Sequence, residues 1–309
     1  MQEMPLVTCM IPCYRKFEYV YEAIQSVIEQ DYPNIELLIS DDASEEFPQK
    51  SIEDYITVHA RENIVYWHVS RHDENVGIVR NINSMIRNGR GEYFMVLAGD
   101  DMFYDGNVVS KVVARFLSTG SDFLACSRLQ CTEKLEPIQF LPTEDEKKQI
   151  KKLNTARKQF ESFAVFRFYN MASGSAMYFS RKNIESMGLY NENYRNWEDG
   201  PRLAAYVKRG IPLPTAHDIV AVKYRCGGVS NNPEGNQFAF SHITNDRALY
   251  TQTVTVSWPN RHWKMRRKLL FWCKWDHCGN AAQRLWLLLR YPELCARILL
   301  RKLRHKPIR

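Results

Sequence analysis

The feature that most constrains this fold is the alternation of short apolar runs with helix-like stretches over the first 130 residues. After the first run, Val20, Ala23, Ile24, Val27 and Ile28 recur at the spacing of one helix face. Repeated units of this kind predict an α/β fold with a doubly wound, mainly parallel sheet. The predicted strands are Leu6–Ile11, Ile35–Ile39, Ile64–Val69, Tyr93–Ala98 and Phe123–Cys126, and the predicted helices include Gln49–His59 and Asn107–Leu117.

Acidic side chains follow two of these apolar runs directly. Asp41 and Asp42 end the second, and Asp100 and Asp101 come after Gly99 at the end of the fourth. Because unpaired buried charges are costly, we expect both pairs at the carboxyl edge of the sheet, where open α/β folds bind ligands. Carboxylate oxygens there suit Mg²⁺ or Mn²⁺, which in turn suit a phosphate. A solvated turn is the alternative interpretation of either pair alone.

Two further motifs extend the predicted crevice. Pro12 and Tyr14 follow the first run, and the tyrosine ring could stack on a base. A third acidic pair, Glu198 and Asp199, stands at the start of a predicted helix over Pro201–Lys208. A carboxylate there could act as a general base on a hydroxyl, although compensation of the helix dipole would also explain an acidic helix start.

Together these stretches resemble family-2 glycosyltransferases with the A-type glycosyltransferase fold. The order and spacing of the motifs carry the resemblance, which extends over roughly residues 5 to 230. It includes Glu198-Asp199 and a segment around Gly174 that is similar to the family's acceptor-side loop. The other matching stretches are Val7–Tyr14, Ala23–Gln30, Asn34–Ser44, Glu74–Gly77 and Gly91–Asp101.

The resemblance implies a nucleoside-diphosphate sugar donor, UDP-linked in our prediction, bound by the first half of the chain. Carried over by position, Pro12 and Tyr14 would border the nucleoside. Asp42 would contact the uracil or its equivalent. Arg80, two positions earlier than the arginine usual in the family, would reach the diphosphate or be a plain surface charge.

The resemblance also implies an inverting, metal-dependent transfer to an acceptor hydroxyl. Asp100 would reach the ribose or the metal, and Asp101 would bind the Mg²⁺ or Mn²⁺ that bridges the diphosphate. Asp199 would be the base, with Glu198 beside it holding a hydroxyl. A glycan or a lipid-linked saccharide is the predicted acceptor, as in the synthesis of a bacterial surface polysaccharide.

Two departures from the family pattern concern the metal. Ala98 stands where the family often has a further Asp, and Gly227 takes a place that often carries His. A third protein ligand is therefore in doubt, and His242 is a weak substitute. Three rivals stay open: a scaffold that kept the fold, a nucleotidyltransferase of similar topology, and a glycoside hydrolase. The nucleotidyltransferase would need a glycine-rich loop after the first strand, which this chain lacks, and the nucleoside and metal motifs disfavour the hydrolase.

Composition divides the chain. We predict a catalytic domain over residues 1–256, with a nucleotide-sugar-binding half (1–130) and an acceptor half (131–256), and a basic helical tail over 257–309. The charge-rich stretch Glu133–Lys158 is predicted to be a surface excursion. The tail contains 14 Lys and Arg against only Asp276 and Glu293, and it is rich in tryptophan. That mixture favours an anionic membrane surface, and no nucleic-acid motif accompanies it. The alternative is a tail whose apolar side packs on the catalytic domain.

The start of the chain has neither the basic nor the apolar part of a signal peptide, and no apolar segment is long enough to span a bilayer. We therefore expect a cytoplasmic protein, peripheral on the inner face of the cell membrane. The eight cysteines show no close-spaced metal pairs and are expected to be reduced. A zinc site formed by Cys273, His277 and Cys278 is a minor alternative.

Overall fold

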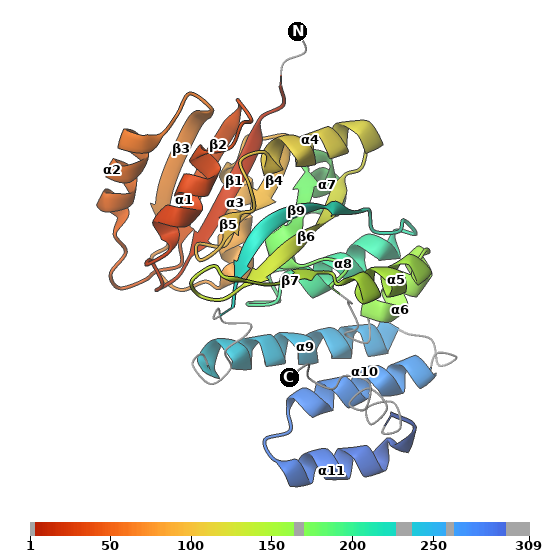
Figure 1. The fold of residues 1–309 in the computed structure, drawn as a ribbon. Coiled ribbons are helices and arrows are strands. Elements are labelled where there is room, and N and C mark those ends of the chain that lie inside the picture. Colours follow the sequence, from red (N-terminus) through yellow and green to blue (C-terminus); the bar gives the residue numbers. More distant parts are fainter. Residues whose placement is uncertain (1–3, 164–169, 227–236, 258–262, 295–309) are drawn as a thin grey trace.

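The computed structural model describes residues 4–163, 170–226, 237–257 and 263–294. Its first half is a parallel α/β unit in which the strands lie in the order β3-β2-β1-β4 (Figure 1). Every residue of β1 and β2 is buried, because both faces of the sheet are covered. The strands are β1 (Val7–Cys13), β2 (Ile35–Asp41), β3 (Ile64–Arg71) and β4 (Tyr93–Val96), and the helices between them are α1 (Val20–Ile28), α2 (Gln49–His59) and α3 (Ile78–Asn88).

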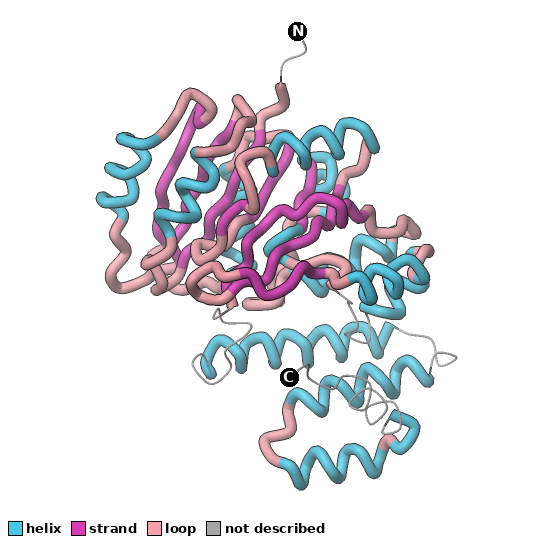
Figure 2. The backbone as a smooth tube through the Cα atoms, in the orientation of Figure 1, coloured by secondary structure: helices cyan, strands magenta, loops and turns pink. Residues whose placement is uncertain are grey.

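The second half continues the same sheet with mixed strand directions. The order beyond β4 is β8-β6-β9-β5, in which β6 and β9 are parallel and the other pairs antiparallel. Figure 2 shows the strands of both halves in magenta, with helices in cyan around them. The predicted α/β sheet is confirmed, and all its strand pairs within the first half are parallel. The elements of this half are β5 (Met102–Phe103), α4 (Val108–Thr119), β6 (Phe123–Cys131), β7 (Pro137–Leu141), η1 (Gly174–Ala176), β8 (Met177–Ser180), α7 (Arg181–Met187), α8 (Asp199–Lys208) and β9 (Thr215–Arg225).

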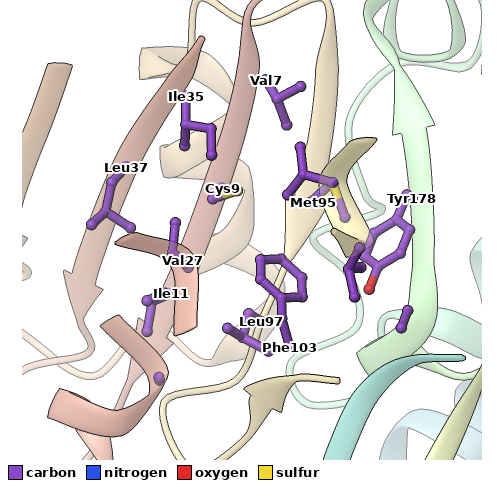
Figure 3. Packing of buried hydrophobic residues seen from close by; sticks show 14 of the residues in the cluster. Val7, Cys9, Ile11, Val27, Ile35, Leu37, Met95, Leu97, Phe103 and Tyr178 are labelled. Carbon is purple, nitrogen blue, oxygen red and sulfur yellow. The ribbon is translucent and has the colours of Figure 1, made fainter. Parts of the chain in front are cut away.

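Two apolar cores cover the two faces of the sheet. Helices α1, α2 and α4 pack on one face, where β1 and β2 side chains such as Cys9 and Leu37 meet Val27 of α1 (Figure 3). Helices α3 and α8 pack on the opposite face, around Phe94 and Phe179. Because both cores lie on one continuous sheet, the strand ends of the two halves are held at fixed positions relative to each other.

The stretch Glu133–Lys158 lies at the surface and contains regular structure to which the sequence analysis assigned no helix or strand. It contains β7, α5 (Glu144–Lys152) and the start of α6 (Ala156–Phe163). Helix α5 begins in a capping box, in which Thr143 and Glu146 satisfy each other's backbone N–H groups. Its single buried residue is Ile150, so the stretch lies at the surface as expected. The weak apolar periodicity concealed a helix that is specified by its cap.

Three helices follow the sheet and lie together at one end of it (Figure 1). They are α9 (Gln237–Ser257), α10 (Trp263–Asp276) and α11 (Ala281–Arg290). Tyr250 and Val254 of α9 join the second core together with Leu269 of α10. Helices α10 and α11 add a small core of their own around Phe271. No described helix has both the length and the apolar character that crossing a bilayer requires.

Candidate active site

The ends of three adjacent parallel strands bring the first group of predicted residues together. The carbonyl of Pro12, in β1, accepts a hydrogen bond from the N–H of Gly99 at 3.3 Å. The next carbonyl, that of Cys13, accepts one from the N–H of Asp42 at 3.0 Å. Tyr14 follows directly with 38% of its surface exposed. The nucleoside motifs and the Asp100-Asp101 turn therefore share one edge of the sheet.

The two carboxylates after β2 have different surroundings. Asp41 is fully buried and accepts hydrogen bonds from the N–H and hydroxyl of Ser44, which is the arrangement of a turn. Asp42 accepts one N–H on each oxygen, from Val76 at 2.7 Å and Gly77 at 2.9 Å. Burial raises the pKa of Asp42, and these two hydrogen bonds oppose that rise. Asp42 thus holds the loop before α3, and its contact with a base stays a prediction.

Arg225, the last residue of β9, fixes the Asp100-Asp101 turn. Its backbone N–H donates to one oxygen of Asp101 at 2.8 Å, and its Nη1 donates to the carbonyl of Asp100 at 2.6 Å. Its Nη2 pairs with Glu22 of α1, and its guanidinium lies 4.0 Å from the centre of the Tyr19 ring. One buried arginine therefore ties the turn to both halves of the molecule.

The second oxygen of Asp101 suits a cation. This oxygen, Oδ2, is buried and has no hydrogen-bond partner among the described residues. Burial raises the pKa of Asp101 well above its ordinary value, and the neighbouring charge of Asp100 raises it further. Asp100 is half-buried beside it. A divalent cation would offset both costs, so these two residues fit Mg²⁺ or Mn²⁺.

The rest of a cation's coordination would have to come from water and a ligand. No group of three or more His, Cys, Asp or Glu among the described residues could hold a metal ion. Mg²⁺ commonly has such a sphere, with one or two carboxylates, several waters and phosphate oxygens. Gly227, the position at which a third ligand was in question, lies outside the described residues.

Glu198 and Asp199 form the second acidic pair, at the start of α8. Burial and the charge of Asp199 raise the pKa of Glu198, and burial likewise raises the pKa of Asp199. An added Cβ on Gly174 would lie 2.4 Å from Oε1 of Glu198, so a larger residue at this position would displace the carboxylate. Because burial raises the pKa of both adjacent carboxyls, they hold a proton more readily than exposed carboxylates do, which suits proton transfer from a hydroxyl.

Helix α9 holds the loop before this pair. Oδ2 of Asp246 accepts the N–H of Arg195 at 2.9 Å and that of Asn196 at 2.7 Å. The side chain of Arg195 donates to the carbonyl of Asn75 at 2.6 Å, and the amide of Asn75 donates to the carbonyl of Asp42 at 3.3 Å. One chain of hydrogen bonds thus runs from α9 to the loop before α3 and on to Asp42.

Arg80 makes a surface contact in this structure. Its Nε lies 3.6 Å from a carboxylate oxygen of Glu192, which also accepts a hydrogen bond from Arg87. More than half of the Arg80 side chain is exposed. Arg80 therefore pairs with Glu192 at the surface, and its contact with the diphosphate stays a prediction.

Three site residues escaped the sequence analysis. They are Arg128 of β6, Arg225 of β9 and Asp246 of α9, and each acts across more than 40 positions of the chain. A lone charged residue within a strand or helix carries no local signal, so only the tertiary contacts identify these three. The minor zinc alternative gains no support, since the described residues contain no group of three or more His, Cys, Asp or Glu that could hold a metal ion.

The sheet with helices on both faces has the A-type glycosyltransferase fold. The model of the family described as glycosyl transferase family 2 matches residues 8–184, which is more than half of the chain. The chain belongs to this family.

Curated relatives match about a third of the chain. WcaA of Escherichia coli, named as a colanic acid biosynthesis glycosyl transferase, is 33% identical over 101 residues, which are 33% of this chain and 34% of WcaA. TuaG of Bacillus subtilis, named for teichuronic acid biosynthesis, is 29% identical over 97 residues, or 31% of this chain and 36% of TuaG. The matches span between 15% and 36% of the relatives' own lengths.

Solved structures show the same fold. The mannosyltransferase PcManGT of Pyrobaculum calidifontis, solved with GDP-Man and Mn²⁺, matches with a TM-score of 0.62 and 16% identity, over 99% of this chain and 82% of its own. Residues 1–349 of S. aureus TarS, solved with UDP-GlcNAc, match with a TM-score of 0.56 and 15% identity, over 78% of this chain and 66% of the TarS chain. At these identities the likeness establishes the fold.

Proposed function

We propose that this protein is an inverting glycosyltransferase that moves a sugar from a nucleoside-diphosphate sugar, with UDP as the nucleotide, to a hydroxyl of a glycan or lipid-linked saccharide. The observation that carries the proposal is the presence of two acidic pairs, one with an unpartnered buried oxygen on Asp101 and one packed against Gly174. UDP-GlcNAc in TarS and GDP-Man in PcManGT support the donor class. The names of TuaG and WcaA support a polysaccharide as product.

In this proposal the strand edge binds the donor. Tyr14 offers its exposed ring to the base, and the backbone around Asp42 borders the nucleoside. Asp100 and Asp101 would hold Mg²⁺ or Mn²⁺, which would offset the negative charge of the diphosphate when bound. Arg225 keeps the turn in place, because its backbone N–H binds the Asp101 carboxylate and its side chain binds the Asp100 carbonyl.

The acceptor hydroxyl gives its proton to the second acidic pair. Asp199 accepts the N–H of Gly200 at 2.6 Å on one oxygen, which orients the carboxylate at the helix start. With its proton removed by Asp199, the hydroxyl oxygen attacks the anomeric carbon opposite the departing diphosphate. One such displacement inverts the anomeric centre. Glu198, beside the base, holds a neighbouring hydroxyl.

Thermal unfolding in the presence of nucleotides tests the donor and the cation together. Because a ligand that binds only the folded state stabilises it by mass action, UDP with Mn²⁺ should raise the Tm by about 5–10 °C at a hundredfold excess over its Kd. The same UDP with a chelator should raise it less. Asp101→Asn is the matched variant, and UDP should raise its Tm by the same amount with Mn²⁺ as with the chelator. A Tm that no nucleoside diphosphate or nucleotide sugar changes would contradict the proposal.

A membrane-facing tail completes the proposal. Leu285, Trp286 and Leu289 of α11 are between 58% and 73% exposed, and Arg284 and Arg290 lie on the same helix. Exposed apolar side chains flanked by arginines suit the boundary of an anionic bilayer, where a lipid-linked acceptor would lie. The tail would keep the protein on the inner face of the cell membrane.

Sedimentation with phosphatidylglycerol vesicles tests this surface. Changing Leu285, Trp286 and Leu289 together to Ser should lower vesicle binding by about tenfold or more, because it removes the apolar contact area. The control changes Val58 and Val65, which are also exposed but lie in the first half of the chain, to Ser. Equal sedimentation of both variants with the vesicles would refute the membrane role.

A further inference from the structure

Arg128, on β6, has a set of contacts that neither acidic pair explains. Its Nη1 donates to the hydroxyl of Ser173 and to that of Ser175 at 3.2 Å. Its guanidinium lies over the ring of Tyr224, with Cζ 4.3 Å from the ring centre. No carboxylate among the described residues lies within ion-pair distance of it. These contacts orient the cation without neutralising it.

The contacts place this cation between the two acidic pairs. Ser173 and Ser175 flank Gly174, the residue against which Glu198 packs. Tyr224 precedes Arg225, whose backbone N–H binds Asp101. The guanidinium is therefore held on one side by the loop around Gly174, which packs against Glu198. On the other side it is held by the end of β9, which binds Asp101.

The charge of Arg128 is also costly where it stands. Its Nε is buried and has no hydrogen-bond partner among the described residues. A guanidinium stays charged at any pH that the protein meets, so it cannot relieve this cost by losing a proton. Its charge reaches both acidic pairs, since it favours the ionised forms of Asp101 and Asp199 and opposes the burial that raises their pKa values. An anionic ligand between the pairs would supply the missing partner.

We propose that Arg128 binds the diphosphate of the donor, at the phosphate that is bonded to the sugar. Ser173, Ser175 and Tyr224 fix the plane of its guanidinium for that contact. The assignment rests on the proposed function, because it requires a nucleoside-diphosphate ligand. A planar guanidinium suits a phosphate better than an ammonium does, since it presents parallel N–H groups to two oxygens.

Calorimetric titration of the full chain with UDP and with UMP, both with Mn²⁺, tests the assignment. UMP lacks the second phosphate, so the ratio of the UDP affinity to the UMP affinity measures what that phosphate contributes to binding. Arg128→Met should weaken UDP binding by about tenfold or more while UMP binding stays within about twofold, because a hydrogen bond to a charged group contributes about 1.5–3 kcal/mol. Arg128→Lys keeps the charge without the planar group and should show a smaller loss for UDP.

Arg209→Met is the matched control. Arg209 also lies over a tyrosine ring, that of Tyr206, but it pairs with Asp122 away from both acidic pairs. It should leave the ratio of UDP to UMP affinity unchanged. Circular dichroism before titration checks that each variant is folded, and Arg128→Lys carries the test if the Met variant is not.

Three results separate the possibilities. Wild-type protein that binds neither nucleotide would overturn the proposed function itself. Equal weakening of UDP and UMP in the Arg128 variants would show that the arginine only supports the loop, and would overturn the assignment. Unchanged UDP binding together with tighter Mn²⁺ binding would identify Arg128 as a mere counter-ion of the carboxylates, and would overturn it as well.

Discussion

In the first half of the molecule, the site residues lie at the ends of parallel strands and are held by backbone groups at the same edge. Asp42 accepts two N–H groups from one loop, and Pro12 receives the N–H of Gly99. In the second half, the position of Glu198 and Asp199 depends on distant elements, since Asp246 of α9 holds the loop that precedes Glu198. Parallel strands give a ligand-binding edge by topology alone, whereas the second half has to build its site by tertiary contacts.

This difference has consequences for which changes each half tolerates. A side chain at a strand end can be replaced without moving the strand, because the sheet is buried on both faces. A residue that holds a loop, such as Asp246, moves every group that the loop carries. We therefore expect chemistry-specific effects from changes at the strand ends and the base, and combined effects from changes at α9.

The largest effect should come from the base itself. Asp199→Asn keeps the shape of the side chain and removes its ability to accept a proton, so turnover should fall by about 10²- to 10⁴-fold. UDP binding should stay within about twofold of wild type, because the donor is assigned to the other half. The measurement is UDP release from a nucleotide sugar, set beside calorimetric binding of UDP.

Asp218→Asn is the control for this change. It removes a carboxylate that pairs with Arg115 at the surface, and it should leave both turnover and binding unchanged. Unaltered turnover in Asp199→Asn would remove Asp199 as the base. A parallel loss of UDP binding would instead show that the two halves are not functionally separate.

The second effect tests the link between the halves. Asp246→Asn weakens the acceptor of two N–H groups, those of Arg195 and Asn196, and Arg195 also contacts the donor-side residue Asn75. A small displacement of both loops should lower kcat by about tenfold and raise the KM for the donor.

Asn245→Ala, an exposed position on the same helix, is the matched control and should behave as wild type. A change in kcat without any change in KM would show that α9 serves the base loop alone. No change in either constant would mean that Asp246 has only a structural role, which its effect on the Tm would then measure.

The same difference decides what could be predicted from the sequence. The parallel strands were predicted because apolar runs and helix spacing are local patterns, and the position of Asp100-Asp101 at a sheet edge follows from them. Strand β9, which contributes Arg225, was not predicted. Helix α5 was not predicted either, because it is specified by its cap and not by its apolar periodicity. The roles of Arg128 and Asp246 depend on contacts between distant segments, for which a single sequence holds no signal.

The smallest effect concerns the proton affinity of Glu198. Burial and the charge of Asp199 raise the pKa of Glu198 in the folded protein, so the folded state binds a proton more tightly than the unfolded chain does. The stabilisation from that proton is complete below the ordinary glutamate pKa and is lost as the pH rises through the raised value. Glu198→Gln is neutral at every pH and escapes this loss.

The Tm of Glu198→Gln relative to wild type should therefore rise between pH 5 and pH 9, by about 2–4 °C for each kcal/mol that the ionised pair costs. Lys50, fully exposed and paired with Asp54, lies in the donor half, and Lys50→Gln should show no such rise. A constant difference in Tm across this range would mean that Glu198 ionises normally, and that the crowding of the acidic pair against Gly174 does not tune its proton affinity. A rise confined to Glu198→Gln would locate the pH-sensitive part of the site in the half that is built by tertiary contacts.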